Sequence, residues 1–126
     1  MPEPMKDVVT WEELDRLVAE LAEQLRAAPK PDVVLAISRG GLVPAGMLGY
    51  RLGWRDMLLA AVVVYDDEHG YRGEAEFLQF PSDDQLRGKR VVIIDEVWDS
   101  GTTIAAVTER VHAAGGQPLT AVLHYK

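Results

Sequence analysis

The sequence contains no cysteine. Disulfide bonds, thiolate zinc sites and cysteine nucleophiles are therefore excluded, and a bound metal would need oxygen or imidazole ligands. The three histidines are His69, His112 and His124, and none has a second histidine at a spacing typical of a metal site. Oxygen ligands are the remaining candidates for metal binding.

Long apolar runs and an excess of positive charge are also missing. No run of 18 or more apolar residues occurs, and Met1 to Pro4 has neither the basic nor the apolar part of a signal peptide. We therefore expect a soluble, cytoplasmic protein with no membrane partner. The 13 Lys and Arg residues stand against 20 Asp and Glu residues, giving a net charge of −7, which argues against non-specific nucleic-acid binding. A small anionic substrate is still compatible with this charge if Mg²⁺ bridges it to carboxylates.

The 126 residues are 48% apolar, enough for one domain over residues 1–126 with a core of its own. Thr10 and Glu13 form a predicted capping box, and apolar residues at helical spacing follow as far as Leu25. The pattern then predicts strands at 33–37, 57–65, 91–94 and 119–125, and helices at 42–52 and from 102 to about 114. Residues 66–75 are either a mobile loop or part of a hairpin returning at 76–80, and residues 81–90 are a polar connection. The alternation favours an α/β fold with a parallel sheet and helices on both faces.

The most informative stretch is 91–103. Four apolar residues predict a buried strand, and the following residues are Asp95, Glu96, Asp99 and a run of small residues that opens a helical pattern. Parallel α/β sheets bind ligands at the carboxyl ends of their strands, and a helix N-terminus with free N–H groups binds phosphate. The acids and the anion-binding residues are therefore expected in one crevice.

Residues 94–103, Ile-Asp-Glu-Val-Trp-Asp-Ser-Gly-Thr-Thr, resemble the phosphoribosyl pyrophosphate (PRPP) motif of the type I phosphoribosyltransferases. The resemblance implies a single-domain, three-layer, Rossmann-like core. It also implies that Asp95 and Glu96 hold the ribose hydroxyls, directly or through Mg²⁺, and that Asp99 is the catalytic residue that handles the proton of the base. Ser100, Gly101, Thr102 and Thr103 would bind the 5′-phosphate. The alternatives are a solvated acidic turn at 95–96 and an N-cap role for Asp99.

A second resemblance lies at residues 38–45, Ser-Arg-Gly-Gly-Leu-Val-Pro-Ala, which are similar to the pyrophosphate loop of bacterial xanthine-guanine phosphoribosyltransferases. It implies that Ser38, Arg39, Gly40 and Gly41 bind pyrophosphate, since consecutive glycines can aim N–H groups at an anion and arginine can bind phosphate oxygens in pairs. Taken alone, the same residues could form a tight turn with a surface arginine. The 66–73 stretch falls where the family has a loop that closes over the site, and an unstructured loop without a role is nearly as consistent.

Lys126 falls where 6-oxopurine enzymes of the family carry the lysine that reads the base, although a solvated terminal lysine fits equally well. The family continues into a hood that stacks an aromatic residue on the base, and we expect this chain to lack that hood. The resemblance predicts a homodimeric enzyme that transfers 5-phosphoribosyl from PRPP to a nucleobase, with a purine as the expected base, and releases pyrophosphate. The alternative is a regulatory module that senses PRPP or a nucleotide without turnover.

Overall fold

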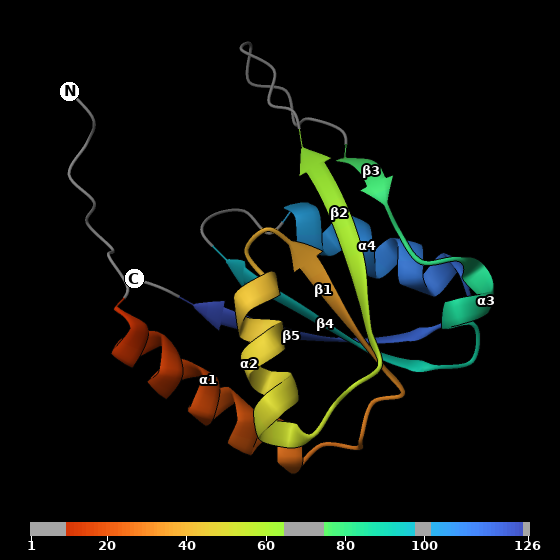
Figure 1. The fold of residues 1–126 in the computed structure, drawn as a ribbon. Coiled ribbons are helices and arrows are strands. Elements are labelled where there is room, and N and C mark those ends of the chain that lie inside the picture. Colours follow the sequence, from red (N-terminus) through yellow and green to blue (C-terminus); the bar gives the residue numbers. More distant parts are fainter. Residues whose placement is uncertain (1–9, 65–74, 98–101, 125–126) are drawn as a thin grey trace, which may run out of the picture.

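The computed structural model describes residues 10–64, 75–97 and 102–124, and its elements are drawn in Figure 1. In chain order they are α1 (Trp11–Arg26), β1 (Val33–Ser38), α2 (Leu42–Leu52), β2 (Met57–Val64), β3 (Ala75–Gln79), α3 (Asp83–Leu86), β4 (Arg90–Val97), α4 (Thr102–Ala113) and β5 (Gln117–His124). The predicted alternation of strands and helices is confirmed.

The five strands form one sheet in the order β3-β2-β1-β4-β5. β2, β1, β4 and β5 pair in parallel, and β4 and β5 stay in register from Arg90 opposite Gln117 to Val97 opposite His124. β3 runs antiparallel to β2 at the edge, so the return strand of a hairpin, one of the two readings of the sequence, is present at Ala75–Gln79 where it was predicted at 76–80. Four parallel strands place their carboxyl ends at one edge of the sheet, where ligands bind in this class of fold.

Helices cover both faces of the sheet, as the alternation predicted (Figure 1). α1 and α2 bury one face together with Val34, Ala36, Val92 and Ile94, while α4 and Leu86 of α3 bury the other with Val33, Leu35, Ile37, Val91 and Ile93. Successive residues of β1 and β4 therefore enter different cores, because side chains alternate along a strand. Two cores around one sheet give the predicted three-layer fold.

The helix ends follow from local chemistry. Thr10 and Glu13 form the predicted capping box of α1, and Gly53 ends α2 with φ of 73°. The prediction missed α3, which lies within the stretch read as a polar connection. Ser82 and Gln85 form a second capping box there, and that signal was present in the sequence. Within the described ranges, no helix is both long and apolar enough to cross a membrane.

Candidate functional site at the carboxyl edge of the sheet

The two motifs singled out by the sequence meet at the carboxyl edge of β1 and β4, which are hydrogen-bonded neighbours. Residues 38–41 end β1 and lead into α2, and β4 carries Asp95 and Glu96 near its end. Figure 1 shows the loop after β1 beside the end of the β4 arrow. The fold therefore brings together the residues predicted to bind pyrophosphate and those predicted to bind ribose.

β4 continues through both acids to Val97 instead of ending before them. Adjacent residues of a strand point to opposite faces, so the two carboxylates separate. Asp95 follows the alternation of Val91 and Ile93, on the α4 face, whereas Glu96 follows Val92 and Ile94, on the α2 face. A ligand that contacts both carboxylates must therefore straddle the end of β4.

Close contacts join the loop after β1 to β4. A Cβ atom placed on Gly40 would lie 2.5 Å from Cγ of Glu96 and 3.0 Å from its carboxyl carbon. A Cβ on Gly41 would collide with the backbone oxygen of Ile94 and lie 2.8 Å from that of Ile37. Gly41 therefore requires glycine for lack of space, because backbone atoms surround it, whereas a side chain at Gly40 would require the Glu96 side chain to move; neither glycine has a positive φ. The glycines let the loop backbone pack directly against the acidic strand.

The loop itself is a tight turn. The Gly41 N–H donates to the Ile37 carbonyl at 2.7 Å, and the Leu42 N–H donates to the Arg39 carbonyl at 3.1 Å. The peptide bond between Ser38 and Arg39 is cis. Arg39 is exposed and Ser38 is half-buried, while Gly41 is buried beneath them. The turn thus presents the arginine side chain to solvent at the edge where the acids lie.

Asp95 is the one buried charged or polar residue in the described part of the chain, with 8% of its surface exposed. Burial raises the pKa of its carboxyl from 3.8 to about 6, with a smaller contribution from the negative charge of Glu96. The Glu96 N–H donates to Oδ1 of Asp95 at 2.8 Å and opposes this rise in pKa. The carboxyl therefore changes charge just below neutral pH, where a bound cation would favour its ionised form.

The carboxylates of Asp95 and Glu96 can hold Mg²⁺ only together with oxygen atoms of a substrate. Two carboxylates are oxygen ligands of the kind that Mg²⁺ prefers, and Mg²⁺ commonly binds through one or two carboxylates plus substrate oxygens. Among the described residues, no group of three or more His, Cys, Asp or Glu side chains is placed to hold a metal. The residues fit an ion that arrives with a phosphorylated ligand.

The predicted phosphate-binding residues are only partly described. α4 begins at Thr102, as the motif predicted, and Thr103 is half-buried in its first turn. Asp99, Ser100 and Gly101 lie outside the described residues, and so do Lys126 and His69 with the 66–74 part of the polar stretch. Among the described residues, α4 is the next element along the chain after β4, and β4 carries Asp95 and Glu96 near its end.

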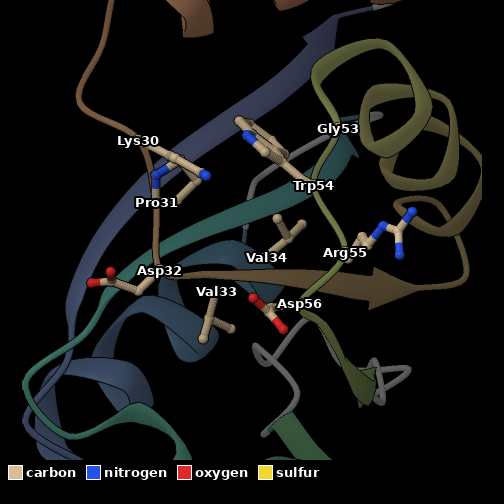
Figure 2. Close-up of a pocket in the computed structure, with 9 residues that line it drawn as sticks. All are labelled: Lys30, Pro31, Asp32, Val33, Val34, Gly53, Trp54, Arg55 and Asp56. Atoms are coloured by element: carbon tan, nitrogen blue, oxygen red, sulfur yellow. The ribbon is translucent and has the colours of Figure 1, made fainter.

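Sequence reasoning did not anticipate a cavity of about 210 Å³ at the opposite, amino edge of the sheet (Figure 2). It lies between the segment 30–32 before β1 and the segment 53–56 before β2, with Val33 and Val34 beneath it. Figure 2 shows the Lys30 and Trp54 side chains on the same side of this hollow. Its position at the amino edge separates it from the candidate site, because β1 and β2 run parallel.

Comparisons with known proteins agree with this geometry. The family model of the phosphoribosyl transferase domain matches residues 6–126. A purine phosphoribosyltransferase from Pyrococcus horikoshii is 36% identical, with 94% of this chain and 77% of that chain covered and a TM-score of 0.79. A hypothetical protein from Neisseria gonorrhoeae, solved with bound ppGpp, is 31% identical, with coverages of 97% and 73% and a TM-score of 0.74.

A more distant structure supports the fold alone. The xanthine-guanine-hypoxanthine phosphoribosyltransferase of Helicobacter pylori is 18% identical, with 90% of this chain and 73% of that chain covered and a TM-score of 0.72. The resemblance read from residues 38–45 and 94–103 is confirmed by the family match over nearly the whole chain. The chain belongs to the phosphoribosyl transferase domain family and is a PRPP-dependent pentosyltransferase of the type I fold.

Proposed function

We propose that this chain transfers the 5-phosphoribosyl group from PRPP to a purine base and releases pyrophosphate, with Mg²⁺ as cofactor. The observation that carries the proposal is the packing of Gly40 against the Glu96 side chain, which joins the two motifs at one edge of the sheet. The choice of a purine is supported by the 36% identity to a purine phosphoribosyltransferase.

The residue roles follow the two faces of β4. Asp95 and Glu96 would hold the ribose hydroxyls and contribute oxygens to Mg²⁺, which when bound neutralises charge on the substrate. Ser38, Arg39, Gly40 and Gly41 would bind the pyrophosphate on the α2 side. Ser100, Gly101, Thr102 and Thr103 would bind the 5′-phosphate at the start of α4, where helix N–H groups favour an anion.

Displacement at the anomeric carbon passes through a state with oxocarbenium character. Carboxylates close to the developing positive charge would stabilise it. In this proposal Asp99 takes the proton lost by the base as the new bond to the sugar forms, and pyrophosphate leaves with the bonding electrons of the old bond. Lys126 would contact the base, in line with its position after β5.

A second candidate function is binding of a nucleotide without turnover. The specific observation in its favour is the Neisseria gonorrhoeae relative solved with bound ppGpp, which carries phosphates on a purine nucleoside. The same crevice would then serve as a sensor, with the phosphate-binding residues retained and the chemistry unused.

An assay of pyrophosphate release separates the two functions. With PRPP, Mg²⁺ and a panel of purine and pyrimidine bases, the enzyme proposal expects turnover with at least one purine, and Asp99→Asn should lower it about 100-fold or more. Asp56→Asn is the matched control, because Asp56 is exposed at the amino edge and should leave turnover unchanged. Tight nucleotide binding with no turnover for any base would instead support the sensor.

The proposal extends to organisation and location. We expect residues 1–126 to act as one domain, in the cytoplasm, and as a homodimer. Limited proteolysis checks the domain, cell fractionation checks the location, and light scattering checks the assembly. A stable fragment shorter than the chain would contradict the single domain.

A further inference from the structure

The cavity at the amino edge of the sheet is a hollow that the proposed reaction does not use. Its volume is about 210 Å³, and its two walls are the segments 30–32 and 53–56 (Figure 2). A water takes up about 30 Å³ in the liquid, so the hollow has room for several waters and suits a small metabolite rather than a polymer. The candidate site lies at the opposite edge, where β1 and β4 end. A ligand of this cavity would therefore not be the substrate of the crevice.

Hydrogen bonds hold both walls of the cavity in place. The Val34 N–H donates to the Asp56 carbonyl at 2.9 Å, which ties the second wall to the start of β1. On the first wall, the Asp32 N–H donates to the Arg90 carbonyl and the Arg90 N–H donates to Oδ2 of Asp32, both at 2.8 Å. Walls that are fixed in this way lose little further conformational freedom when a ligand binds.

Much of the lining is apolar. Val34 is 2% exposed and belongs to the core, and Trp54 and Pro31 are half-buried. Trp54 packs against the core between the sheet and the helices α1 and α2, which holds its indole in place. Figure 2 shows this indole turned toward the cavity. These surfaces suit the apolar part of a ligand, because ligand pockets are lined mainly by apolar and aromatic side chains.

Four charged side chains line the cavity, and two of them are available to a ligand. Asp32 already accepts the Arg90 N–H, and Arg55 points away from the hollow in Figure 2. Lys30 and Asp56, one from each wall, are exposed, and neither forms an ion pair with another residue in the described ranges. A purely anionic ligand would face Asp56, and a purely cationic ligand would face Lys30. The pair therefore favours a ligand that carries both charges.

The ends of two helices add to this charge pattern. α1 ends at Arg26 and α2 ends at Leu52, and Figure 1 shows these two C-terminal ends close together. Nη2 of Arg26 donates to the Arg51 carbonyl at 3.3 Å, which joins the two ends. Helix C-termini carry a partial negative charge and favour cations. The positive group of a ligand is thus favoured beside the wall 53–56, which follows α2 directly.

We propose that this cavity binds a small zwitterion, namely a free α-amino acid with an apolar side chain. Its carboxylate would contact Lys30, its ammonium group would contact Asp56, and its side chain would lie against Trp54 and Val34. Charge-assisted hydrogen bonds at both ends would fix its orientation, and the apolar contact would add affinity. The inference rests on the cavity alone and holds whether the crevice catalyses a reaction or only binds a nucleotide.

Isothermal titration calorimetry of the full chain at neutral pH tests the site with leucine, methionine and phenylalanine. At least one of them should bind with a Kd of about 1 mM or lower. Each is compared with its amide, which lacks the carboxylate, and with the acid that lacks its amino group. Both analogues should bind at least about 10-fold more weakly, the loss expected for one hydrogen bond between charged groups. Glycine should also bind more weakly, because it lacks the apolar side chain.

Lys30→Gln locates the binding within the molecule. Lys30 is exposed, so this variant should keep the far-ultraviolet circular dichroism of the folded chain. In the variant, the amino acid and its amide should bind with nearly the same Kd, because the carboxylate has lost its partner. Arg16→Gln is the matched control, since it removes the same charge at an exposed position on α1 and should bind the amino acid as the unmodified chain does.

Three results would overturn the proposal. They are the absence of heat with all of these amino acids at millimolar concentration, amides that bind as tightly as the amino acids, and a Lys30→Gln variant that still distinguishes the two. Pyrophosphate release is measured without an amino acid, so its absence would overturn the proposed reaction and leave this binding site intact.

Discussion

At the scale of single residues, Gly40 offers the sharpest test of the candidate site. An alanine methyl there would lie 2.5 Å from the Glu96 side chain, which must then move. Since a side chain can move at little cost, we expect Gly40→Ala to fold with nearly unchanged stability. The displaced carboxylate should reduce kcat/KM for PRPP by about 10-fold or more, as a misplaced binding group does. Steady-state kinetics and a thermal melt measure the two effects.

The Glu96→Ala background provides the control for this prediction. If the clash with Glu96 causes the loss, Gly40→Ala should add little to the effect of Glu96→Ala, which is the signature of coupled residues. Independent, additive losses would mean that Gly40 acts through the pyrophosphate loop alone.

Gly41→Ala should behave differently, because its methyl would meet backbone atoms. The carbonyl oxygens of Ile94 and Ile37 belong to two paired strands and cannot shift without disturbing the sheet. We expect a loss of about 2–3 kcal/mol in the free energy of unfolding, as for overpacked sites. Urea denaturation measures it, and stability equal to that of Gly40→Ala would contradict the packing described here.

The raised pKa of Asp95 predicts that the free energy of unfolding depends on pH. Its carboxyl has a pKa of about 6 in the folded chain against 3.8 ordinarily, because it is buried. Between these values the folded state binds more protons than the unfolded state, so this group lowers the free energy of unfolding as pH rises through that window. The full effect is about 3 kcal/mol and is reached above pH 6.

Asp95→Asn isolates this contribution from that of the other acids. Denaturation of both proteins from pH 4 to pH 8 should show the variant gaining stability relative to the unmodified chain as pH rises toward 6, then a constant difference. The same variant should lose Mg²⁺-dependent PRPP binding, because the ionised carboxylate is the form that binds a cation. Parallel stability profiles would show that Asp95 titrates normally.

At the scale of elements, Arg110 joins α4 to the edge strand β3. Its guanidinium carbon lies 5.1 Å from the ring centre of Phe77 and 5.3 Å from that of Phe80, and the two rings meet edge to face at 5.2 Å. Cation–π contacts at exposed sites contribute about 0.5–1 kcal/mol each. Arg110→Gln should therefore lower the free energy of unfolding by about 1 kcal/mol, or the Tm by about 4 °C.

Arg16→Gln is the control for this prediction. Arg16 pairs with Glu20 on α1, and both side chains are 59% exposed, so the loss should be only a few tenths of a kcal/mol. Equal losses in the two variants would mean that the aromatic contacts of Arg110 add nothing to an ordinary surface charge.

The helices and strands show which parts of the fold could be predicted from sequence patterns. The apolar runs at 33–37 and 91–94 predicted buried strands, and the capping box at Thr10 predicted the start of α1, because both signals are local. α3 was missed because four residues are too few for a helical period, although Ser82 and Gln85 cap it. The run of acids was expected to follow its strand, but pairing with β5 extends β4 through them to Val97.

At the scale of the whole molecule, the sequence predicted three layers but not which residues meet between them. The order of strands and helices and the alternation of side chains along a strand are local patterns that the sequence shows directly. The contact of Gly40 with Glu96 instead depends on β1 and β4 becoming neighbours in the sheet. The raised pKa of Asp95 likewise depends on burial, which a sequence pattern does not report. The two motifs could therefore be recognised from the sequence, whereas their position relative to each other could be known only from the fold.

The last prediction concerns the stability of the molecule as a unit. A ligand that binds only the folded state raises the free energy of unfolding by about 2.7 kcal/mol at 100 times its Kd, which corresponds to a Tm rise of about 10 °C for a chain of this length. PRPP with Mg²⁺ should produce this shift. Mg²⁺ alone should produce almost no rise in Tm, because the described residues offer no group of three metal ligands.

The Gly40→Ala variant should have the Tm of the unmodified chain in the absence of ligand, but PRPP should raise its Tm less. The reason is that the displaced Glu96 side chain belongs to the binding site and not to the core. A full shift with PRPP in the absence of any divalent ion would show that the carboxylates are not used through a metal.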